Sequence, residues 1–174
     1  VALLLALAIS PPSLAQTDDA TFGTLVDALA PGNFKDREAA ASALAATEDP
    51  RAVAVLQSLI DGDLYVIEAT GKVLLGEGAG AIDPVTGAAF EGAAEAETDK
   101  VKVNNGLRRG LRTFIGQLTL MSDDRGTRLS AAQSVLRDAN PDNLELLDVA
   151  LAAEADAEVK STMETARAAI ILKS

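Results

Sequence analysis

Three arginines on one short segment are the side chains of this sequence best suited to bind an anionic group. Arg108, Arg109 and Arg112 follow the pair Asn104-Asn105, and a guanidinium binds a carboxylate or phosphate in a planar, bidentate geometry. Arg108 and Arg112 are four residues apart and therefore share a face of a helix. These arginines are expected either to receive an anionic ligand or a partner's acidic surface, or to form salt bridges with the acidic segment before them; the salt bridges are favoured. One of the two asparagines is expected to cap the helix, although the pair is also a candidate for binding.

Other catalytic or metal-binding chemistry has little support in the sequence. There is no histidine and no cysteine, which removes the usual zinc ligands and the Ser-His and thiol nucleophiles. Glu91, Glu95 and Glu97 could hold a cation, but they lack the spacing and turn glycine of a calcium loop, so a solvated acidic loop is expected. The glycines between Gly76 and Gly80 are not followed by the Lys-Ser/Thr of a phosphate-binding loop. We therefore expect no enzymatic activity, no cofactor and no metal.

Composition narrows the class of protein further. The 174 residues are enough for one domain with a real core, and hydrophobic residues make up 48% while aromatic residues make up only 3%. Small apolar side chains suit closely packed helices better than a β-sandwich. The formal net charge of −11 disfavours binding to nucleic acid and to anionic lipid surfaces, because both would repel the chain.

Two segments of the chain repeat the same helical pattern. A helix is expected from Phe34 to Ala46 behind an Asn33 cap, and another from Pro50 to Ile60. The apolar and proline positions that follow Arg37 recur with identical spacing after Arg128, and a weaker third copy begins at Val159-Lys160, with Met163, Ala166 and Ile170 facing inward. Paired helices repeated in this way are typical of a HEAT-like α-solenoid, although alanine-rich sequence also produces chance matches. The predicted fold class is mainly α, a HEAT-like α-solenoid with a β-hairpin insertion.

The insertion lies between the two strong copies of the repeat. Residues 64–67 and 72–75 are expected to form a β-hairpin, and residues 81–84 and 88–90 a second, shorter one. Residues 61–100 contain nine acidic side chains and only two lysines. The helix that follows, Asn104 to Met121, is expected to have a continuous apolar stripe. The stripe consists of Leu107, Leu111, Phe114, Leu118 and Met121.

The first residues are typical of a secretory signal peptide. An uncharged apolar run of nine residues is followed by prolines and then by Ser13-Leu14-Ala15, so cleavage after Ala15 is expected. A short buried helix is the alternative, and the run is too short for a membrane-spanning helix. The predicted organisation is therefore a signal peptide at 1–15, helical repeats at 16–62, the acidic β-hairpin insertion at 63–102 and further helical repeats at 103–174.

The insertion and the helix after it carry a resemblance to a known family. Leu64-Tyr65-Val66, the segment 83–87 (Asp-Pro-Val-Thr-Gly) and the segment 100–112 (Lys-Val-Lys-Val-Asn-Asn-Gly-Leu-Arg-Arg-Gly-Leu-Arg) resemble the N-terminal extracytoplasmic domain of urea ABC transporter permeases. The resemblance extends over the chain from Phe22 onward and includes the order of signal peptide, repeats, insertion and repeats. It implies a role in urea uptake at the periplasmic side of the bacterial inner membrane. The pore-forming helices of such permeases would follow this domain, so any link to the membrane would be made through them.

Two functions are therefore expected from the sequence. The first is an extracytoplasmic interaction domain of a urea ABC transporter permease, with the other transporter subunits and the periplasmic urea-binding protein as partners. The second is a free periplasmic HEAT-repeat scaffold unrelated to transport. A hydrolase built on two carboxylates ranks last, because no acidic pair is placed on adjacent rigid elements.

Overall fold

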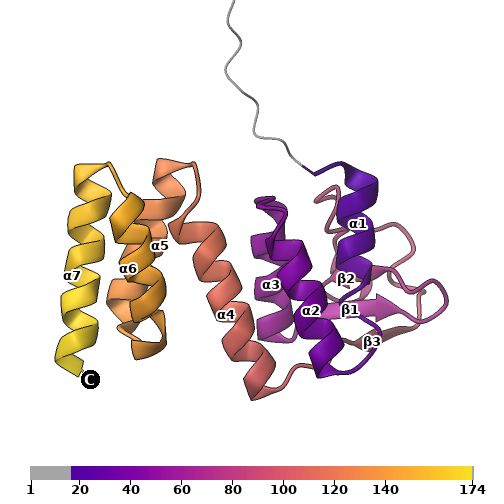
Figure 1. Cartoon of the computed structure of the whole chain (residues 1–174). Coiled ribbons are helices and arrows are strands. Elements are labelled where there is room, and N and C mark those ends of the chain that lie inside the picture. Colours follow the sequence, from indigo (N-terminus) through magenta and orange to yellow (C-terminus); the bar gives the residue numbers. More distant parts are fainter. Residues whose placement is uncertain (1–16, 174) are drawn as a thin grey trace, which may run out of the picture.

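The chain folds into a row of helices with one small sheet at its N-terminal end (Figure 1). The computed structural model describes residues 17–173, so the predicted signal peptide lies outside the described residues. None of the helices in this range is both long and apolar enough to cross a membrane. In chain order the elements are α1 (Asp19–Asp27), α2 (Phe34–Ala45), α3 (Arg51–Asp61), β1 (Leu64–Ile67), β2 (Val73–Leu75), η1 (Gly78–Gly80), β3 (Thr98–Lys100), α4 (Asn105–Leu120), α5 (Arg125–Asp138), η2 (Pro141–Asn143), α6 (Leu144–Ala153) and α7 (Ala157–Lys173).

Side-chain caps fix the first residues of several helices. Asn33 and Asp36 form a capping box at the start of α2, each accepting a hydrogen bond from the other's backbone N–H. At the start of α4, Asn104 Oδ1 accepts a hydrogen bond of 2.8 Å from the backbone N–H of Leu107. Both caps were predicted from the sequence and are confirmed. Asp124 caps α5 in the same way.

Two arginines at equivalent positions of the repeat anchor their helices in a similar manner. Arg37 in α2 is only 6% exposed, and its guanidinium donates hydrogen bonds to the backbone carbonyls of Leu29 (2.7 Å) and Ala30 (2.8 Å), just after α1. Arg128 in α5 donates to two carbonyl oxygens of the connection from α4, at 2.8 and 2.9 Å. Each arginine satisfies carbonyls that follow a helix end and lack a partner within the helix. The sequence repeat therefore corresponds to a repeated structural contact.

The two copies of the repeat correspond to α2 followed by α3 and to α5 followed by α6, and α7 begins the third copy. The predicted inward positions Met163, Ala166 and Ile170 of α7 are buried. Pro50 directly precedes α3, as expected for a residue that lacks a backbone N–H. Pro141 instead opens the 3₁₀ turn η2, and α6 begins only after this turn. The mainly α fold class and the HEAT-like helical repeats are confirmed.

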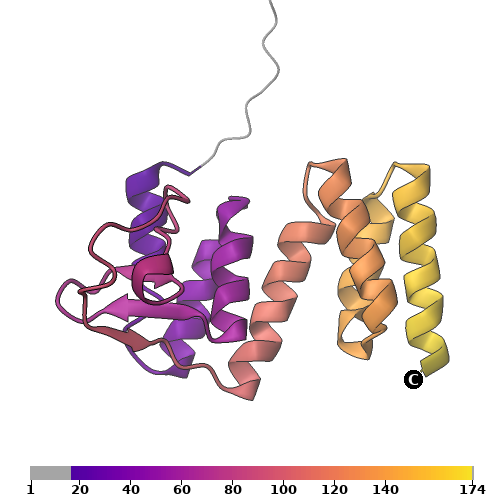
Figure 2. The ribbon, with the colours of Figure 1, turned by 180° about the vertical axis from the view of Figure 1, so that it is seen from behind.

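Helix α4 lies between two separate hydrophobic cores (Figures 1 and 2). Its N-terminal part contributes Leu107 and Leu111 to the first core, which α1, α2, α3 and the sheet complete. Its last residue, Leu120, belongs to the second core, which α5, α6 and α7 form. The predicted stripe was wrong at its end, because Met121 is 51% exposed. The helix stops at Leu120, so the residue after it no longer follows the helical period.

The insertion forms a three-stranded antiparallel sheet in the order β2-β1-β3. The predicted first hairpin is confirmed, with Leu64 opposite Leu75. The prediction of a second hairpin was wrong, because residues 81–84 and 88–90 do not form a pair of strands. Ile82 forms only isolated bridges, one to Leu75 and one to Ala89. Strand β3 was missed because its sequence, Thr-Asp-Lys, has no apolar residue and no alternation. It pairs with the free edge of β1.

Candidate binding groove

The five candidate interaction residues, Asn104, Asn105, Arg108, Arg109 and Arg112, lie at the start of α4 in different surroundings. Asn104 is occupied as the cap of α4, and Asn105 is the first residue of the helix and exposed. Arg109 and Arg112 are exposed and Arg108 is half-buried. Of the five, Arg112 lines a groove. The remaining four do not line it.

The favoured salt bridges between the arginines of α4 and the acidic insertion were a wrong prediction. Within residues 17–173, Arg108, Arg109 and Arg112 form no ion pair. The insertion is held elsewhere: Asp27 of α1 accepts a hydrogen bond of 2.8 Å from the backbone N–H of Val73 in β2. Figures 1 and 2 show α2 and α3 between α4 and most of the sheet. Closeness in sequence therefore did not become closeness in space.

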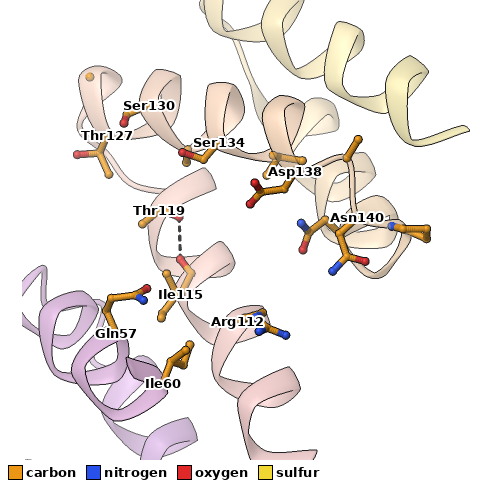
Figure 3. Close-up of a pocket in the computed structure, with 16 residues that line it drawn as sticks. Gln57, Ile60, Arg112, Ile115, Thr119, Thr127, Ser130, Ser134, Asp138 and Asn140 are labelled. Atoms are coloured by element: carbon orange, nitrogen blue, oxygen red, sulfur yellow. Dashed lines mark hydrogen bonds between the residues drawn. The ribbon is translucent and has the colours of Figure 1, made fainter. Parts of the chain in front are cut away.

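A groove lies between α3, α4 and α5, where the two cores meet (Figure 3). Its volume is about 1070 Å³. Helix α3 contributes Gln57 and Ile60, and α4 contributes Arg112, Ile115 and Thr119. The remaining wall is α5 and the turn that follows it, with Gly126, Thr127, Ser130, Ala131, Ser134, Val135, Asp138, Ala139, Asn140, Pro141 and Asn143.

Helix α5 supplies four of the nine polar side chains that line the groove, more than any other element, and none of the four was a predicted site residue. Thr127, Ser130, Ser134 and Asp138 are separated by three, four and four residues, a spacing that places them on one helical face. In Figure 3 they line the side of α5 that faces α4. The regular spacing of short polar residues was present in the sequence. This polar face lines a groove only because α4 lies opposite α5, and the sequence does not show that arrangement.

Two opposite charges stand on different walls of the groove. Arg112 extends from α4, and Asp138 from the end of α5 (Figure 3). Neither side chain forms an ion pair with another described residue. Both charges are therefore open to a ligand. Within residues 17–173, no group of three or more acidic side chains is placed to hold a metal ion.

The strongest electrostatic contacts lie outside the groove. Arg51 at the start of α3 forms ion pairs with Asp49 (2.8 Å) and with Asp19 of α1 (2.6 Å), and it donates a hydrogen bond of 3.1 Å to the carbonyl of Val85 in the insertion. Burial acts to raise the pKa of Asp49, but hydrogen bonds from the side chain and backbone of Arg51 outweigh it and hold this pKa below its usual value. The cluster ties α1, α3 and the insertion together.

A second cluster joins α5 to the connection between α6 and α7. Arg125 Nε lies 2.8 Å from Asp156 Oδ2, and Arg128 Nε lies 2.7 Å from Glu154 Oε2. The pKa of Asp156 is lowered to about 2, first by the hydrogen bond from Arg125 and then by backbone N–H groups, and the hydrogen bond from Arg128 lowers the pKa of Glu154. None of these four residues lines the groove. Their shifted pKa values belong to contacts between helices.

Comparison with known proteins agrees with the helical repeat. The family model for the PBS lyase HEAT-like repeat matches residues 36–62, which include most of α2 and all of α3. No match was found among curated proteins or among solved structures. The matched segment contains Arg37, whose contact recurs at Arg128. The chain therefore contains a HEAT-like repeat at α2 and α3.

Proposed function

We propose that this protein is a binding domain whose partner occupies the groove between α3, α4 and α5. The observation that carries the proposal is the groove itself, a space of about 1070 Å³ at the junction of the two cores. Helical repeats form extended concave surfaces on which partners dock. In this protein, polar side chains from three different helices line the groove.

The chemistry of the lining favours recognition over catalysis. Its polar groups are hydroxyls and amides, with the single cation Arg112 and the single anion Asp138 on opposite walls. Such groups donate and accept hydrogen bonds without forming a nucleophile and base pair. We propose that the domain binds its partner without a catalytic step and without a cofactor.

The resemblance of the insertion and of α4 to urea ABC transporter permeases suggests which partner this is. On that basis we propose that the groove engages another subunit of such a transporter, or the periplasmic urea-binding protein, at the outer side of the bacterial inner membrane. Arg112, the last residue of the resembling segment, lies in the groove, which supports this proposal. A free periplasmic scaffold unrelated to transport is the alternative.

Photo-crosslinking in cells tests whether the groove binds a partner and which protein that partner is. A crosslinking amino acid is placed at Ser130, in the groove, and in a control variant at Gln133, which is exposed on the same helix outside the groove. We expect a discrete crosslinked protein from position 130 and not from position 133. Equal crosslinking from both positions, or none from position 130, would overturn the groove as the binding site.

The identity of the crosslinked protein then separates the two functions. Transporter subunits or the urea-binding protein, identified by mass spectrometry, would support the role in transport. A protein with no link to transport would favour the scaffold.

A further inference from the structure

We infer that the groove binds an extended peptide segment of the partner, with one acidic side chain paired to Arg112. This inference rests on the proposed binding function and specifies its chemistry. It is argued from three features of the groove: the spacing of polar groups along α5, their free hydrogen-bonding capacity and the unpaired charge on α4.

The polar side chains of α5 are spaced much like the groups of an extended chain. With a rise of 1.5 Å per residue, Thr127, Ser130, Ser134 and Asp138 succeed one another at intervals of about 4.5 to 6 Å along the helix axis. An extended peptide presents equivalent groups on one side every two residues, or about 6.6 Å. A strand laid along α5 can therefore meet several of these side chains in succession.

Several lining groups still have hydrogen-bonding capacity to offer. The hydroxyl group of Ser130 forms no hydrogen bond with another described residue, whereas the side chain of Thr127 is bonded to the Asp124 carboxylate. Ser134 Oγ accepts a bond of 2.7 Å from Arg137, which leaves its proton free to donate. Thr119 differs, because its hydroxyl already donates to the Ile115 carbonyl within α4 (Figure 3). The α5 wall is thus the one with free hydroxyls.

The amide side chains of the groove complement these hydroxyls. Gln57 donates its NH₂ group to Asp61, at 3.0 and 3.1 Å, so its side-chain oxygen remains as an acceptor. Asn140 Oδ1 accepts from the backbone N–H of Asp142 at 3.0 Å, so its NH₂ group remains as a donor. A peptide backbone alternates N–H donors and C=O acceptors, and needs both kinds of partner when it leaves water. The lining supplies both.

The size of the groove is sufficient for a segment of chain. At about 1070 Å³ it is slightly larger than the range of roughly 300–1,000 Å³ typical of small-molecule sites. Apolar side chains of Ile60, Ile115, Ala131 and Val135 lie among the polar groups. Successive side chains of a strand point to opposite faces, so every second side chain of a bound strand would face the groove and could contact these apolar residues.

Arg112 specifies an acidic side chain in the bound segment. Its guanidinium has no ion-pair partner among residues 17–173, and a carboxylate is the protein group that it binds in a bidentate geometry. The protein as a whole carries a net charge of −11 and would repel a strongly acidic tract. Asp138 on the opposite wall adds to that repulsion. The arrangement therefore fits a single carboxylate in an otherwise uncharged or weakly basic segment.

A phage-displayed library of random 12-residue peptides, selected on the intact protein, tests the inference. Enriched peptides are synthesised with a fluorophore and titrated by anisotropy against four variants. Ser130→Arg blocks the groove, and Gln133→Arg is its control on the exposed side of α5. Arg112→Glu reverses the charge in the groove, and Arg109→Glu makes the same change on α4 outside it.

We expect the enriched peptides to share an aspartate or glutamate and to lose binding to Ser130→Arg but not to Gln133→Arg. Changing that acid to its amide should weaken binding about tenfold or more, since a hydrogen-bonded charge contributes roughly that factor. Arg112→Glu should weaken the acidic peptide to a similar degree, whereas Arg109→Glu should change its affinity less than about twofold. A peptide with lysine in place of the acid should regain affinity for Arg112→Glu.

Two other outcomes would overturn the inference in distinguishable ways. Peptides that Ser130→Arg excludes, but that respond neither to removal of their acid nor to Arg112→Glu, would leave the groove as a binding site and remove the role of Arg112. Failure to obtain any peptide that discriminates Ser130→Arg from Gln133→Arg would overturn the peptide inference, while crosslinking at positions 130 and 133 decides separately whether a partner occupies the groove.

Discussion

Two sets of arginine side chains contrast in their surroundings. Arg37, Arg51 and Arg128 are buried or half-buried, and each binds backbone carbonyls or carboxylates of a neighbouring segment. Arg109 and Arg112 are exposed on α4 and form no ion pair with a described residue. Substitutions in the first group should therefore lower stability, because they leave buried carbonyls or carboxylates unpaired. Substitutions in the second should leave the fold intact.

Asp156 makes the stability of the C-terminal helices depend on pH in the acidic range. Its pKa is lowered from an ordinary value of 3.8 to about 2, first by Arg125 and then by the N–H groups at the start of α7. The folded protein therefore favours the ionised carboxylate. Its contribution to stability is complete above about pH 4 and is lost as the pH falls toward 2.

Nuclear magnetic resonance of the Asp156 side-chain carboxyl carbon should show a titration midpoint near 2 in the unmodified protein. In Arg125→Gln the midpoint should rise, yet stay below 3.8, because the backbone donors of α7 remain. Arg137→Gln is the control, since Arg137 bonds to Ser134 and not to Asp156. An unchanged midpoint in Arg125→Gln would show that the ion pair does not hold in solution.

At the scale of elements, α4 is the helix that joins the two halves, and two of its glycines mark the close approaches. A Cβ added at Gly110 would lie 2.9 Å from Glu38 Oε1 of α2. One added at Gly116 would lie 2.6 Å from Leu146 Cδ2 of α6. Glu38 is exposed and its carboxylate can move away, whereas Leu146 packs against the second core. The two positions therefore tolerate a methyl group differently.

Alanine at these two positions should change stability in opposite directions. Gly110→Ala should stabilise the protein by about 0.5–1 kcal/mol, the usual gain in a helix interior. Gly116→Ala has the same helical gain, but displacing Leu146 should cost about 1–3 kcal/mol, so a net loss is expected. Guanidinium chloride unfolding of both variants measures the difference. Equal stabilisation by both would mean that α6 packs less closely on α4 than the structure shows.

At the scale of the whole molecule, two cores share one helix and the groove lies where they meet. The first core gathers α1, α2, α3 and the sheet, and the second gathers α5, α6 and α7. Repeat proteins are stabilised by contacts between neighbours, so their ends can open separately. A groove between two such units changes shape whenever they move relative to each other. Binding there should in turn couple their stabilities.

Destabilising the second core should therefore leave the first core largely protected. Met163 is fully buried, and Met163→Ala should cost roughly 2–5 kcal/mol. In native-state hydrogen exchange, the free energy of opening of amides in α5 to α7 should fall by a similar amount. The value for amides in α2 and α3 should change much less. Met121→Ala, at a residue 51% exposed, is the matched control and should alter neither set. An equal loss in both halves would show a single cooperative unit.

The sequence by itself determined the features that depend on near neighbours. The caps Asn33 and Asn104, the helical repeat around Arg37 and Arg128, and the first hairpin of the insertion all follow from residues a few positions apart. Helical period, capping and strand alternation are local properties, so they could be read directly. The short polar strand β3 gave no such signal, because only its pairing with β1 makes it a strand.

Tertiary structure alone decided which side chains meet. The arginines of α4 and the acids of the insertion are close in sequence, yet Leu107 and Leu111 turn the helix toward the first core and the arginines do not reach the acids. The groove unites Gln57, Arg112 and Ser130 from three helices. Their approach depends on how α4 packs against both cores, which is a sum of many weak long-range contacts. No local pattern in the sequence encodes that sum, so the structure was needed to find the groove.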